Sequence, residues 1–548
     1  MLTNALKMIL FIAMLLPTAA CGKKQKKIEK PEIVHTSQLP AGWYTQEKQQ
    51  LSQEIDHYLG IAKTAFEVAI DPAFIKALIV PHAGHYYSGL CAASAYQTLQ
   101  NKNATNERKN HDIKRVIILA PSHTVFFNGV SLPYYTTYQT VLGDLKVDDD
   151  AITVLSKSDL FKKFPDPHLT EHAIEIQLPF LQKTIADFTI VPLIIGHIKN
   201  MAEYYTIAEQ LKKIITDQTL VVVSSDFVHH GKNYDFTPFN KNILYHVRYL
   251  DSLAVQAIAT QSLLLFDKVV TETKATICGR EPIKVLLALL EQQTLGDCQS
   301  QLACYYTSAH IPQARFNNLI NWKPLLDNDV ADEKVQNSVS YVSLIFTTQQ
   351  LTSLKKEDRL TGYEKKGLLT FARSTLENSL KNHNDQIQEH LLAPIISPGI
   401  EQKTGAFVTL NTKTGRLRGC IGRILSPDPL YKTVSSMSKA AAFNDSRFSP
   451  VTRDELDGLG IDISVLSKPE KVASADDITI GKHGIILTKI GLNNHTLGSA
   501  VFLPQVPVEN GWNLKTTLEH LSEKAGFDKD AWKSDCSFEV FEGFEIKE

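Results

Sequence analysis

The sequence has few cysteines and no apolar run that could cross a membrane. Seven cysteines in 548 residues exclude a small fold held together by a disulfide framework. The apolar run Met8 to Leu16 falls well short of the ~20 residues that a membrane-spanning helix needs. A formal net charge of -2, without a long basic stripe, gives no reason to expect a nucleic-acid partner. With 43% apolar residues and no repeats, the chain is expected to form globular domains.

The amino terminus has the features of a secretory signal. Lys7 precedes the apolar run, and small residues come directly before Cys21. This resembles the lipobox of bacterial lipoproteins, although Thr18 stands where Leu is usual. The resemblance implies that residues 1–20 are removed, that Cys21 is lipidated, and that the protein is anchored to a membrane of the bacterial cell envelope. An ordinary cleavage near Ala20 and an uncleaved anchor are the alternatives. Residues 21–44, which begin with a lysine-rich stretch, are expected to form a flexible tether.

Four short apolar runs are each followed by a cluster of His, Asp or Ser. They are Lys76–Val80, Arg115–Leu119, Phe188–Ile195 and Leu220–Val223. Such runs, bounded by Gly and Pro, predict buried strands. Helices are expected at Glu47–Phe66, Glu171–Gln182 and Pro282–Gln292, with a closing strand at Ser338–Phe346. The alternation predicts an α/β fold in which a mostly parallel sheet is flanked by helices.

Two histidines follow predicted strands at the edge where such a sheet binds its ligands. Ligands of open parallel sheets lie beyond the carboxyl ends of the strands. His82 and His123 each follow a strand and a proline. Either residue alone is more often a structural hydrogen-bonding group than a ligand. Together, on successive strands, they favour a metal site, because imidazole suits Zn, Cu, Fe and Ni.

Further candidates come from two later segments. Cys278 precedes Gly279 and a predicted helix, whose amino-terminal partial charge is expected to lower the thiol pKa; a small buried hydrophobic residue is the alternative. Asp226 and His229 provide a carboxylate and an imidazole for proton transfer. Their alternatives are a capping Asp in a turn and a surface His.

The remaining histidines carry weaker predictions. His172 and Glu175 share one face of a predicted helix, where an ion pair on a solvated surface is favoured over support of a metal site. Weaker still are His85, His197 and His230. Half of the 18 histidines lie between His82 and His230, so metal chemistry is expected in the first half of the chain.

A polar, charged stretch at residues 347–362 predicts a domain boundary and a linker. Beyond it, a helix is expected at Tyr363–Asn382, strands at Phe407–Leu410 and Ile461–Leu466, and a capping box at Thr452–Glu455. Residues 363–548 are therefore expected to form a smaller α+β domain.

Five ordered motifs in residues 45–346 resemble the Memo family. They are Pro81–Gly84, Pro121–His123, Glu171-His172 with Gln177–Phe180, Ser224–Phe227 with His229, and Cys278–Ile283. The resemblance implies a fold similar to the catalytic subunit of class III extradiol dioxygenases. It also implies one metal ion, Fe(II) or Cu with Zn as a further option, held by His82, His123 and Cys278, with Asp226 and His229 as nearby catalytic groups. Ring-cleaving enzymes have a carboxylate where Cys278 stands, which argues against ring cleavage. His85 replaces a usual Tyr and adds an imidazole near the site.

The carboxyl-terminal region resembles the AMMECR1 family through Leu417–Gly422, Ala442–Phe448 and Val501–Val506. Cys420, beside Arg418 in a glycine-bordered turn, could be an activated thiolate, although a packed core thiol is favoured. Asn444, Asp445 and Arg447 are candidate polar groups of a groove; turn chemistry is the alternative. Both families recur with a radical S-adenosylmethionine protein, which suggests a shared pathway but names no reaction. Radical S-adenosylmethionine enzymes work in the cytosol, which conflicts with the predicted export of this chain.

Two classes of function follow from these observations. The first is a metal-dependent enzyme, with redox chemistry on an unidentified small molecule ahead of hydrolysis. The second is a non-catalytic lipoprotein that binds a metal or ligand, or acts as a scaffold. Cys298 and Cys304 are close enough in sequence to pair in an exported protein, but spacing alone does not decide this.

Overall fold

The first half of the chain folds around one large sheet with a parallel centre. The computed structural model describes residues 31–100, 112–311, 335–381, 386–388, 390, 393–394, 396–491 and 495–548. The central strands run parallel in the order β2 (Ile75–Val80), β9 (Thr219–Ser224), β3 (Arg115–Pro121) and β8 (Thr189–Ile195). All four predicted strands are present. Their continuous apolar sequences suit strands that are buried on both faces.

Antiparallel strands complete both edges of this sheet. On one side, β12 (Asn337–Thr347) pairs with β2, and both β11 (Gln299–Thr307) and β10 (His229–Gly231) pair with β12. On the other side, β4 (Val130–Leu132) pairs antiparallel with β8, and β7 (Phe161–Lys163) pairs parallel with β4. The predicted α/β fold is confirmed, with a sheet that is parallel at its centre and antiparallel toward its edges, and the expected closing strand is β12.

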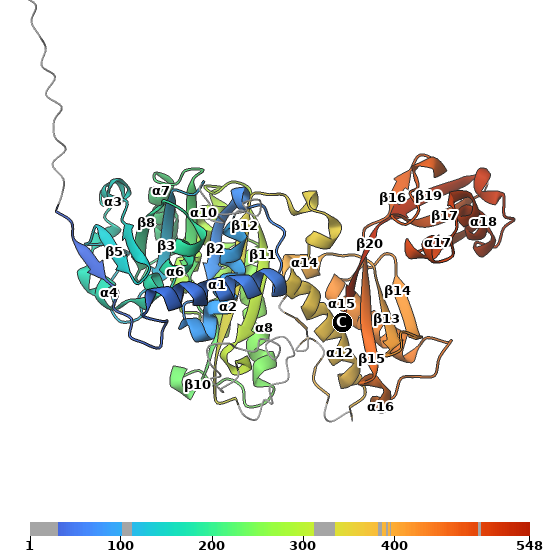
Figure 1. The fold of residues 1–548 in the computed structure, drawn as a ribbon, viewed down its shortest axis with the longest axis horizontal. Coiled ribbons are helices and arrows are strands. Elements are labelled where there is room, and N and C mark those ends of the chain that lie inside the picture. Colours follow the sequence, from blue (N-terminus) through green and yellow to red (C-terminus); the bar gives the residue numbers. More distant parts are fainter. Residues whose placement is uncertain are drawn as a thin grey trace, which may run out of the picture.

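Helices cover both faces of the sheet (Figure 1). The connection from β2 to β3 moves along the sheet in one direction, and the connection from β8 to β9 moves in the other. Because such connections are right-handed, their helices lie on opposite faces of the sheet. One layer holds α1 (Lys48–Ala65), α2 (His85–Tyr96) and α6 (Leu178–Thr184); the other holds α7 (Met201–Lys212), α9 (Leu263–Thr273) and α10 (Arg280–Glu291). Further helices are α3 (Asp149–Leu155), α4 (Pro165–Thr170), α5 (His172–Glu175) and α8 (Ile243–Ala259).

The single helix expected at Glu171–Gln182 is wrong. The structure has two short helices there, because α5 ends at Glu175 and α6 begins at Leu178. Pro179 lies in the first turn of α6, where its missing N–H group is not needed for the helix. The break matters for the site described below, where Glu171 and His172 lie against His123 while Glu175 faces the amino-terminal segment.

The expected tether is shorter than residues 21–44. Strand β1 (Val34–Thr36) pairs with β5 (Thr137–Thr140), which continues into β6 (Gly143–Lys146). The ring of His35 stacks on Tyr135 with centroids 4.7 Å apart. Residues 34–44 therefore belong to the fold. Residues 1–30, with the predicted signal and Cys21, lie outside the described residues.

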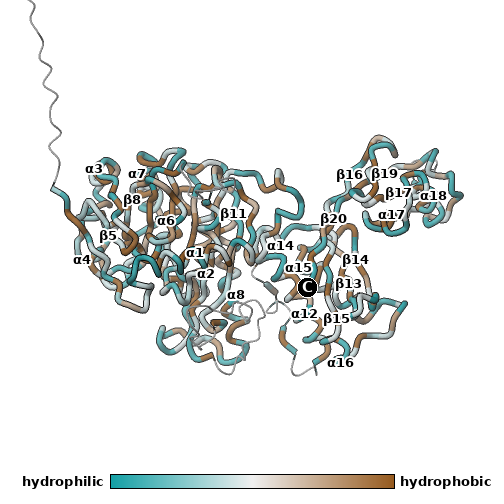
Figure 2. The backbone as a smooth tube through the Cα atoms, in the orientation of Figure 1, coloured by the Kyte–Doolittle hydropathy of each residue, from teal (hydrophilic) through white to brown (hydrophobic). Residues whose placement is uncertain are grey.

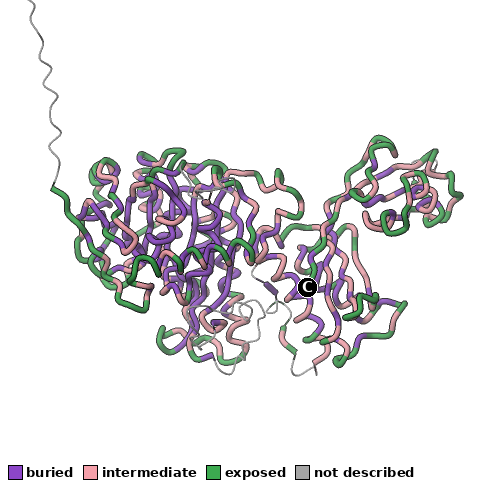
Figure 3. The backbone as a smooth tube through the Cα atoms, in the orientation of Figure 1, coloured by how far each residue is buried: buried purple, intermediate pink, exposed green. Residues whose placement is uncertain are grey.

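The carboxyl-terminal region contains two small lobes, each with its own apolar core (Figures 2 and 3). The first has the strand order β14 (Leu417–Arg423), β13 (Ala406–Thr412), β15 (Leu459–Leu466) and β20 (Gly543–Lys547). Its helices are α12 (Gly362–Ser379), α14 (Pro398–Glu401), α15 (Leu430–Phe443) and α16 (Arg453–Leu456). The second has the order β16 (Glu470–Val472), β19 (Cys536–Phe541), β17 (Gly484–Ile490) and β18 (Thr496–Phe502), with α17 (Gln505–Glu509) and α18 (Leu514–Lys524).

The predicted helices, strands and capping box of this region match α12, β13, β15 and the Thr452–Glu455 box before α16. The residues of the expected linker contain two short 3-10 turns, Leu351–Ser353 and Lys356–Asp358. At its end the Thr361 hydroxyl donates to the Leu302 carbonyl at 2.9 Å. Within the described part of the chain, none of the helices has the length and apolar character needed to span a bilayer.

Candidate metal centre

Three predicted donors meet beyond the carboxyl ends of β2 and β3. One ligand atom each from His82, His123 and Cys278 lies within 4.8 Å of the other two. The closest pair is His82 Nε2 and Cys278 Sγ, 3.0 Å apart. His82 follows β2, His123 follows β3, and Cys278 precedes α10. Tetrahedral bonds of about 2.0–2.3 Å put neighbouring N and S donors roughly 3.5 Å apart, so the spacing fits one shared ion.

The ring of His82 is held in the tautomer that a metal ligand needs. The Ser224 hydroxyl donates its only proton to the Ala173 carbonyl at 2.7 Å. It must therefore accept from His82 Nδ1, which lies 3.0 Å away. Nε2 is left with a free lone pair directed toward Cys278. Burial, with the nearby rings of His123 and His172, lowers the pKa of His82 well below its ordinary value, so this imidazole is neutral.

A buried carboxylate orients His123 in the same way. Glu171 accepts from His123 Nδ1 and from the His123 backbone N–H, each at 2.8 Å. Burial raises the pKa of Glu171, but its bonds to His123 outweigh burial and hold that pKa below the usual range. Nε2 of His123 is thus free for an ion. Carboxylate–histidine pairs of this kind commonly support metal ligands.

Glu171 is not itself a ligand in this arrangement. Glu171 and His172 form a second close group with His123. However, Oε1 of Glu171 accepts from His123 Nδ1 and from the Ala173 N–H at 2.9 Å, while Oε2 accepts from the His123 N–H. Three of the roughly four acceptor positions of the carboxylate are in use, two of them by His123, so Glu171 is a support for His123. Among the described residues, the site with free donor atoms is His82, His123 and Cys278.

Replacing Glu171 by glutamine is expected to weaken metal binding. The amide can accept through only one oxygen, whereas the carboxylate accepts through both, and it lacks the charge that holds the His123 tautomer; the loss of such partners typically costs about 10–100-fold in affinity. Metal titration with a competing chelator measures this change. Glu175→Gln is the matched control, because Glu175 is an equally buried acid on the same segment. Equal affinities for wild type and Glu171→Gln would contradict the assignment.

Close packing of Gly279 against Ser225 positions Cys278. A Cβ on Gly279 would lie 2.3 Å from the Ser225 Cβ, and the Gly279 N–H donates to the Ser225 hydroxyl at 3.1 Å. The Asp226 N–H donates to Cys278 Sγ at 3.2 Å. The expected lowering of the thiol pKa is wrong: burial and the charge of Asp226 raise the pKa of Cys278 well above its ordinary value. The effect of desolvation on the thiol pKa is thus larger than that of the partial positive charge at the start of α10.

Asp226 and His229 face the same site from the loop after β9. The Asp226 carboxylate accepts from the His82 N–H at 2.8 Å. Burial raises the pKa of Asp226, while the charge of His229 opposes that rise. His229 Nδ1 lies 2.8 Å from the Phe227 carbonyl and 2.9 Å from the Thr276 carbonyl, so Nδ1 carries the proton. Its Nε2 is therefore a proton acceptor.

Asp251 on α8 contacts the loop after β9 that carries Asp226 and His229. Its carboxyl accepts from the Val228 N–H at 3.0 Å and from the Tyr305 hydroxyl at 3.1 Å. Burial raises the pKa of Asp251 to about 7. The folded chain therefore binds more protons than the unfolded chain between about pH 4 and pH 7, and stability is lost as the pH rises through this window.

Replacing Asp251 by asparagine is expected to remove part of that pH dependence. Between pH 5 and pH 7 the fall in unfolding free energy should be smaller by about 2–3 kcal/mol in Asp251→Asn than in the wild type. Denaturant unfolding at both pH values measures the difference. Burial also raises the pKa of Glu364 to about 7. In Asp251→Asn, Glu364 should therefore still cause a fall of similar size in the unfolding free energy over this pH range. Parallel pH profiles for wild type and variant would contradict the prediction.

His172 lies against the site, contrary to the expectation of a solvated ion pair with Glu175. Its ring stacks on His123 with centroids 4.6 Å apart and lies 5.2 Å from the ring of His82. Glu175 is instead buried under the amino-terminal segment, where it accepts from Ser37, Tyr44, Gln38 and Tyr138. Burial and the charge of His123 lower the pKa of His172 to about 4.

His85 does not reach the site. Its Nε2 lies 3.2 Å from the Ile176 carbonyl and its Nδ1 lies 3.7 Å from Glu54. The ring is buried between Tyr44 and Phe180. The expectation of an additional imidazole at the metal centre is wrong, because α2 begins at this residue and turns its side chain toward α1 and α6.

In the carboxyl-terminal domain, Cys420 is half-buried on the edge strand β14 and is not a core thiol; no group of metal donors among the described residues includes it. Its N–H donates to Asp445 at 2.9 Å, and its carbonyl accepts from Arg447 at 3.1 Å. Asp445 and Arg447 also pair with each other at 2.7 Å. They satisfy the backbone N–H and carbonyl of Cys420 on the open edge of the strand, which is a structural role. Asn444 is exposed and ends α15.

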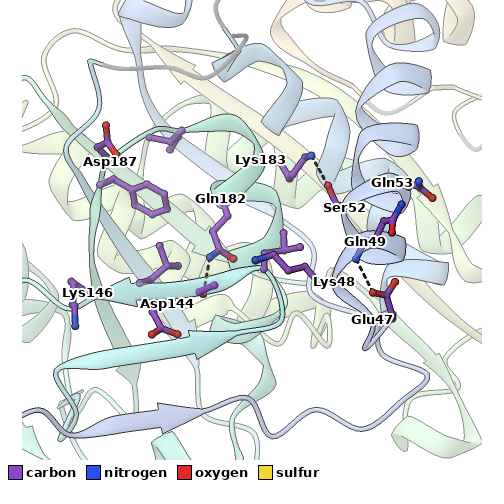
Figure 4. Close-up of a pocket in the computed structure, with 15 residues that line it drawn as sticks. Glu47, Lys48, Gln49, Ser52, Gln53, Asp144, Lys146, Gln182, Lys183 and Asp187 are labelled. Atoms are coloured by element: carbon purple, nitrogen blue, oxygen red, sulfur yellow. Dashed lines mark hydrogen bonds between the residues drawn. The ribbon is translucent and has the colours of Figure 1, made fainter. Parts of the chain in front are cut away.

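A separate polar hollow lies between α1, β6 and α6 (Figure 4). Its volume is about 980 Å³. Gln182 Nε2 donates to the Gly143 carbonyl at 3.0 Å, and Lys183 donates to Ser52 at 2.8 Å. The residues that line it include none of the donors at the metal centre.

Sequence reasoning did not single out Glu171 or Ser224 as supports of the two histidines. Both stand in motifs quoted for the Memo resemblance, directly before His172 and Ser225. Their roles depend on the break between α5 and α6 and on the parallel pairing of β2 with β9, which brings Ser224 beside Val80. Neither contact follows from local spacing.

These features define an α/β protein with a His–His–Cys centre. The Memo-like protein family matches residues 38–317, and the AMMECR1 family matches residues 369–546. The chain belongs to the Memo-like family and carries an AMMECR1 domain fused behind it.

Among the relatives, Protein MEMO1 of Xenopus tropicalis is 34% identical over 264 residues, which are 46% of this chain and 84% of that protein. Protein MEMO1 of Homo sapiens is 30% identical over 264 residues with the same coverage. A memo-1 homolog of Caenorhabditis elegans is 31% identical and covers 47% of this chain and 72% of that protein. Among solved structures, an uncharacterized protein of Pyrococcus horikoshii, PH0010, is 33% identical, covers 33% of this chain and 89% of that one, and has a TM-score of 0.29.

Proposed function

We propose that the Memo-like domain holds one metal ion at His82, His123 and Cys278 and acts as a metal-dependent redox enzyme on a small molecule. The observation that carries this proposal is the convergence of three donor atoms within 4.8 Å. It is strengthened by the two imidazoles, whose Nδ1 atoms are engaged with Ser224 and Glu171, which leaves the Nε2 atoms to face the other donors. A closed structural site usually has four protein ligands, so a set of three leaves one coordination position open.

The donor chemistry favours a soft or borderline ion. A thiolate with two imidazoles suits Fe(II), Cu or Zn better than Mg or Ca. A bound Fe or Cu ion would supply electron transfer, and a Zn ion would supply Lewis acidity. The side chain of His123 is 28% exposed and that of His172 is 19% exposed, so a small molecule can approach the centre from this side.

The groups around the centre can hold and move protons. His229 presents Nε2 as a base, because Nδ1 is fixed by two carbonyls. Asp226 accepts from the His82 backbone, and burial raises the pKa of its carboxyl, so it is a second group that can hold a proton. Simple metal storage does not require such a pair, which favours chemistry over storage.

The alternatives are a metal-dependent hydrolase and a non-catalytic binding or scaffold protein. Hydrolysis would use the same Asp226 and His229 with a Zn ion. A scaffold would capture a metal or ligand without turnover, while the AMMECR1 domain docks a partner. Failure to consume any compound of a broad panel of redox and ester substrates, together with tight metal binding, would favour the scaffold.

A crystal structure of the full chain with anomalous scattering at the Fe, Cu and Zn edges tests the proposal. We expect one peak within bonding distance of His82 Nε2, His123 Nε2 and Cys278 Sγ. A peak bound elsewhere, or none after loading with each ion, would reject the site. Turnover of a compound from the substrate panel, abolished by Asp226→Asn, would distinguish an enzyme from a carrier.

We further propose that the protein is a lipoprotein of the bacterial cell envelope, anchored through Cys21. The support is the basic, apolar and small-residue order of residues 7–21. Fractionation with metabolic lipid labelling tests this, with Cys21→Ala as the comparison. We expect the lipid label in the wild type and none in Cys21→Ala. Equal labelling of the two proteins, or no label in either, would contradict the proposal. A pathway shared with a radical S-adenosylmethionine protein is testable by co-purification.

A further inference from the structure

Two cysteines that are far apart in sequence lie together in the core of the Memo-like domain. Cys91 is on α2 and Cys304 is on β11, and both side chains are completely buried. Cys91 Sγ lies 3.8 Å from the Cys304 carbonyl oxygen. Both are free thiols in the structure. They are separate from the metal centre, whose thiol is Cys278.

The packing of α2 explains why the two residues come so close. Around Cys91 the helix carries the small residues Ala92, Ala93, Ser94 and Ala95. Small side chains let the helix approach β11 and β12 closely, and α2 contacts both strands. On β11 the pairing register shifts between Leu302 and Cys304, so that the strand is irregular at this residue.

A serine hydroxyl is a weak hydrogen-bonding partner for the Cys91 thiol. The Ser343 hydroxyl lies 3.4 Å from Cys91 Sγ and donates to the Cys91 carbonyl. Burial and the neighbouring Cys91 thiol raise the pKa of Cys304 well above its ordinary value. Thiolates are the reactive species in disulfide exchange, so the raised pKa makes the Cys304 thiol slow to react once the core has closed.

We propose that Cys91 and Cys304 form a disulfide when the chain folds in an oxidising compartment. Cys298, the partner that sequence spacing suggested for Cys304, contacts the Leu295 carbonyl instead. In the reaction, one cysteine thiolate attacks a disulfide oxidant, such as oxidised glutathione, and releases one reduced thiol. The second cysteine thiolate then attacks the mixed disulfide and releases the other. Two protein thiols are oxidised, one disulfide is reduced, and both protons end on the released thiols.

The bond would close a loop, residues 91–304, that contains two of the three candidate metal donors, while His82 lies just before it. Residues 91–304 include His123, Asp226, His229 and Cys278, and α2 begins three residues after His82. Cross-links that close long loops restrict the unfolded chain strongly. The disulfide would thus stabilise the domain without touching any metal donor.

Peptide mapping tests the proposal in two settings. The full chain with its own amino terminus is produced in a bacterium, alkylated at lysis and digested without reduction. In parallel, the purified reduced protein is incubated with oxidised glutathione in sub-denaturing urea, so that α2 opens transiently. We expect a linked peptide pair that contains Cys91 and Cys304 and lacks two hydrogens. Cys298→Ser should retain the pair, and Cys91→Ser should lose it.

The outcomes separate cleanly. The linked pair in either setting supports the proposal. Alkylated Cys91 and Cys304 in both settings, or a link from Cys304 to Cys298, would overturn it. Because the wild-type peptide map is decisive by itself, a variant that fails to fold does not affect the conclusion.

Discussion

Cys278→Ser is expected to lose most of its bound metal. The serine hydroxyl stays protonated near neutral pH and is a harder donor than a thiolate, so the affinity for Fe(II), Cu or Zn should fall by at least about 100-fold. Elemental analysis of the purified full chain, after loading and gel filtration, measures the metal per chain. A decrease from about one ion to near none is the expected result.

The same assay on the two histidines tests whether the three residues act as one site. His82→Ala and His123→Ala should each lose metal to a similar degree, because two remaining donors hold an ion poorly. Cys298→Ser and His197→Ala are the matched controls, since Cys298 is a buried thiol and His197 an exposed imidazole outside the cluster. Unchanged metal content in all three site variants would remove the basis for the proposed function.

The sequence predicted the sheet and the two histidine donors because their signals are local. Each central strand is a short Val- and Ile-rich run, and His82, His123 and Asp226 directly follow such runs. The carboxyl ends of parallel strands share one edge, so the clusters had to be neighbours. Cys278 came from the family resemblance and from its position before a helix.

The supports of the site could not be predicted in the same way. Ser224 orients His82 only because β9 lies beside β2, and Glu171 reaches His123 only because the helix breaks before α6. The burial of Glu175 depends on the amino-terminal segment, which was expected to be a tether. The wrong sign for the thiol pKa has a related cause: the helix end is visible in the sequence, whereas the desolvation of Cys278 is a property of the folded core.

Gly279→Ala is expected to damage both the stability of the fold and the metal centre. The new methyl group would lie 2.3 Å from the Ser225 Cβ, 2.4 Å from its hydroxyl oxygen and 2.8 Å from the Ser224 carbonyl. These atoms belong to the segment that holds His82 and Asp226, so neither side can move freely. Overpacking of this kind costs about 1–3 kcal/mol. Denaturant unfolding measures the loss.

Metal titration of the same variant measures the effect on the site. Moving the start of α10 away from Ser225 would shift Cys278 relative to His82 Nε2, and misplacement of one donor should weaken binding by about tenfold or more. Gly60→Ala is the matched control, because a Cβ there meets open space on helix α1, where alanine favours the helix by about 1 kcal/mol.

A double variant identifies the cause. Adding Ser225→Gly to Gly279→Ala removes the two closest contacts and leaves the Ser224 carbonyl at 2.8 Å. Recovery of part of the stability and of the metal affinity would show that steric contact at this point sets the position of the thiol. Wild-type stability and affinity in Gly279→Ala alone would show that Cys278 is positioned by something other than the close packing of α10 on the loop after β9.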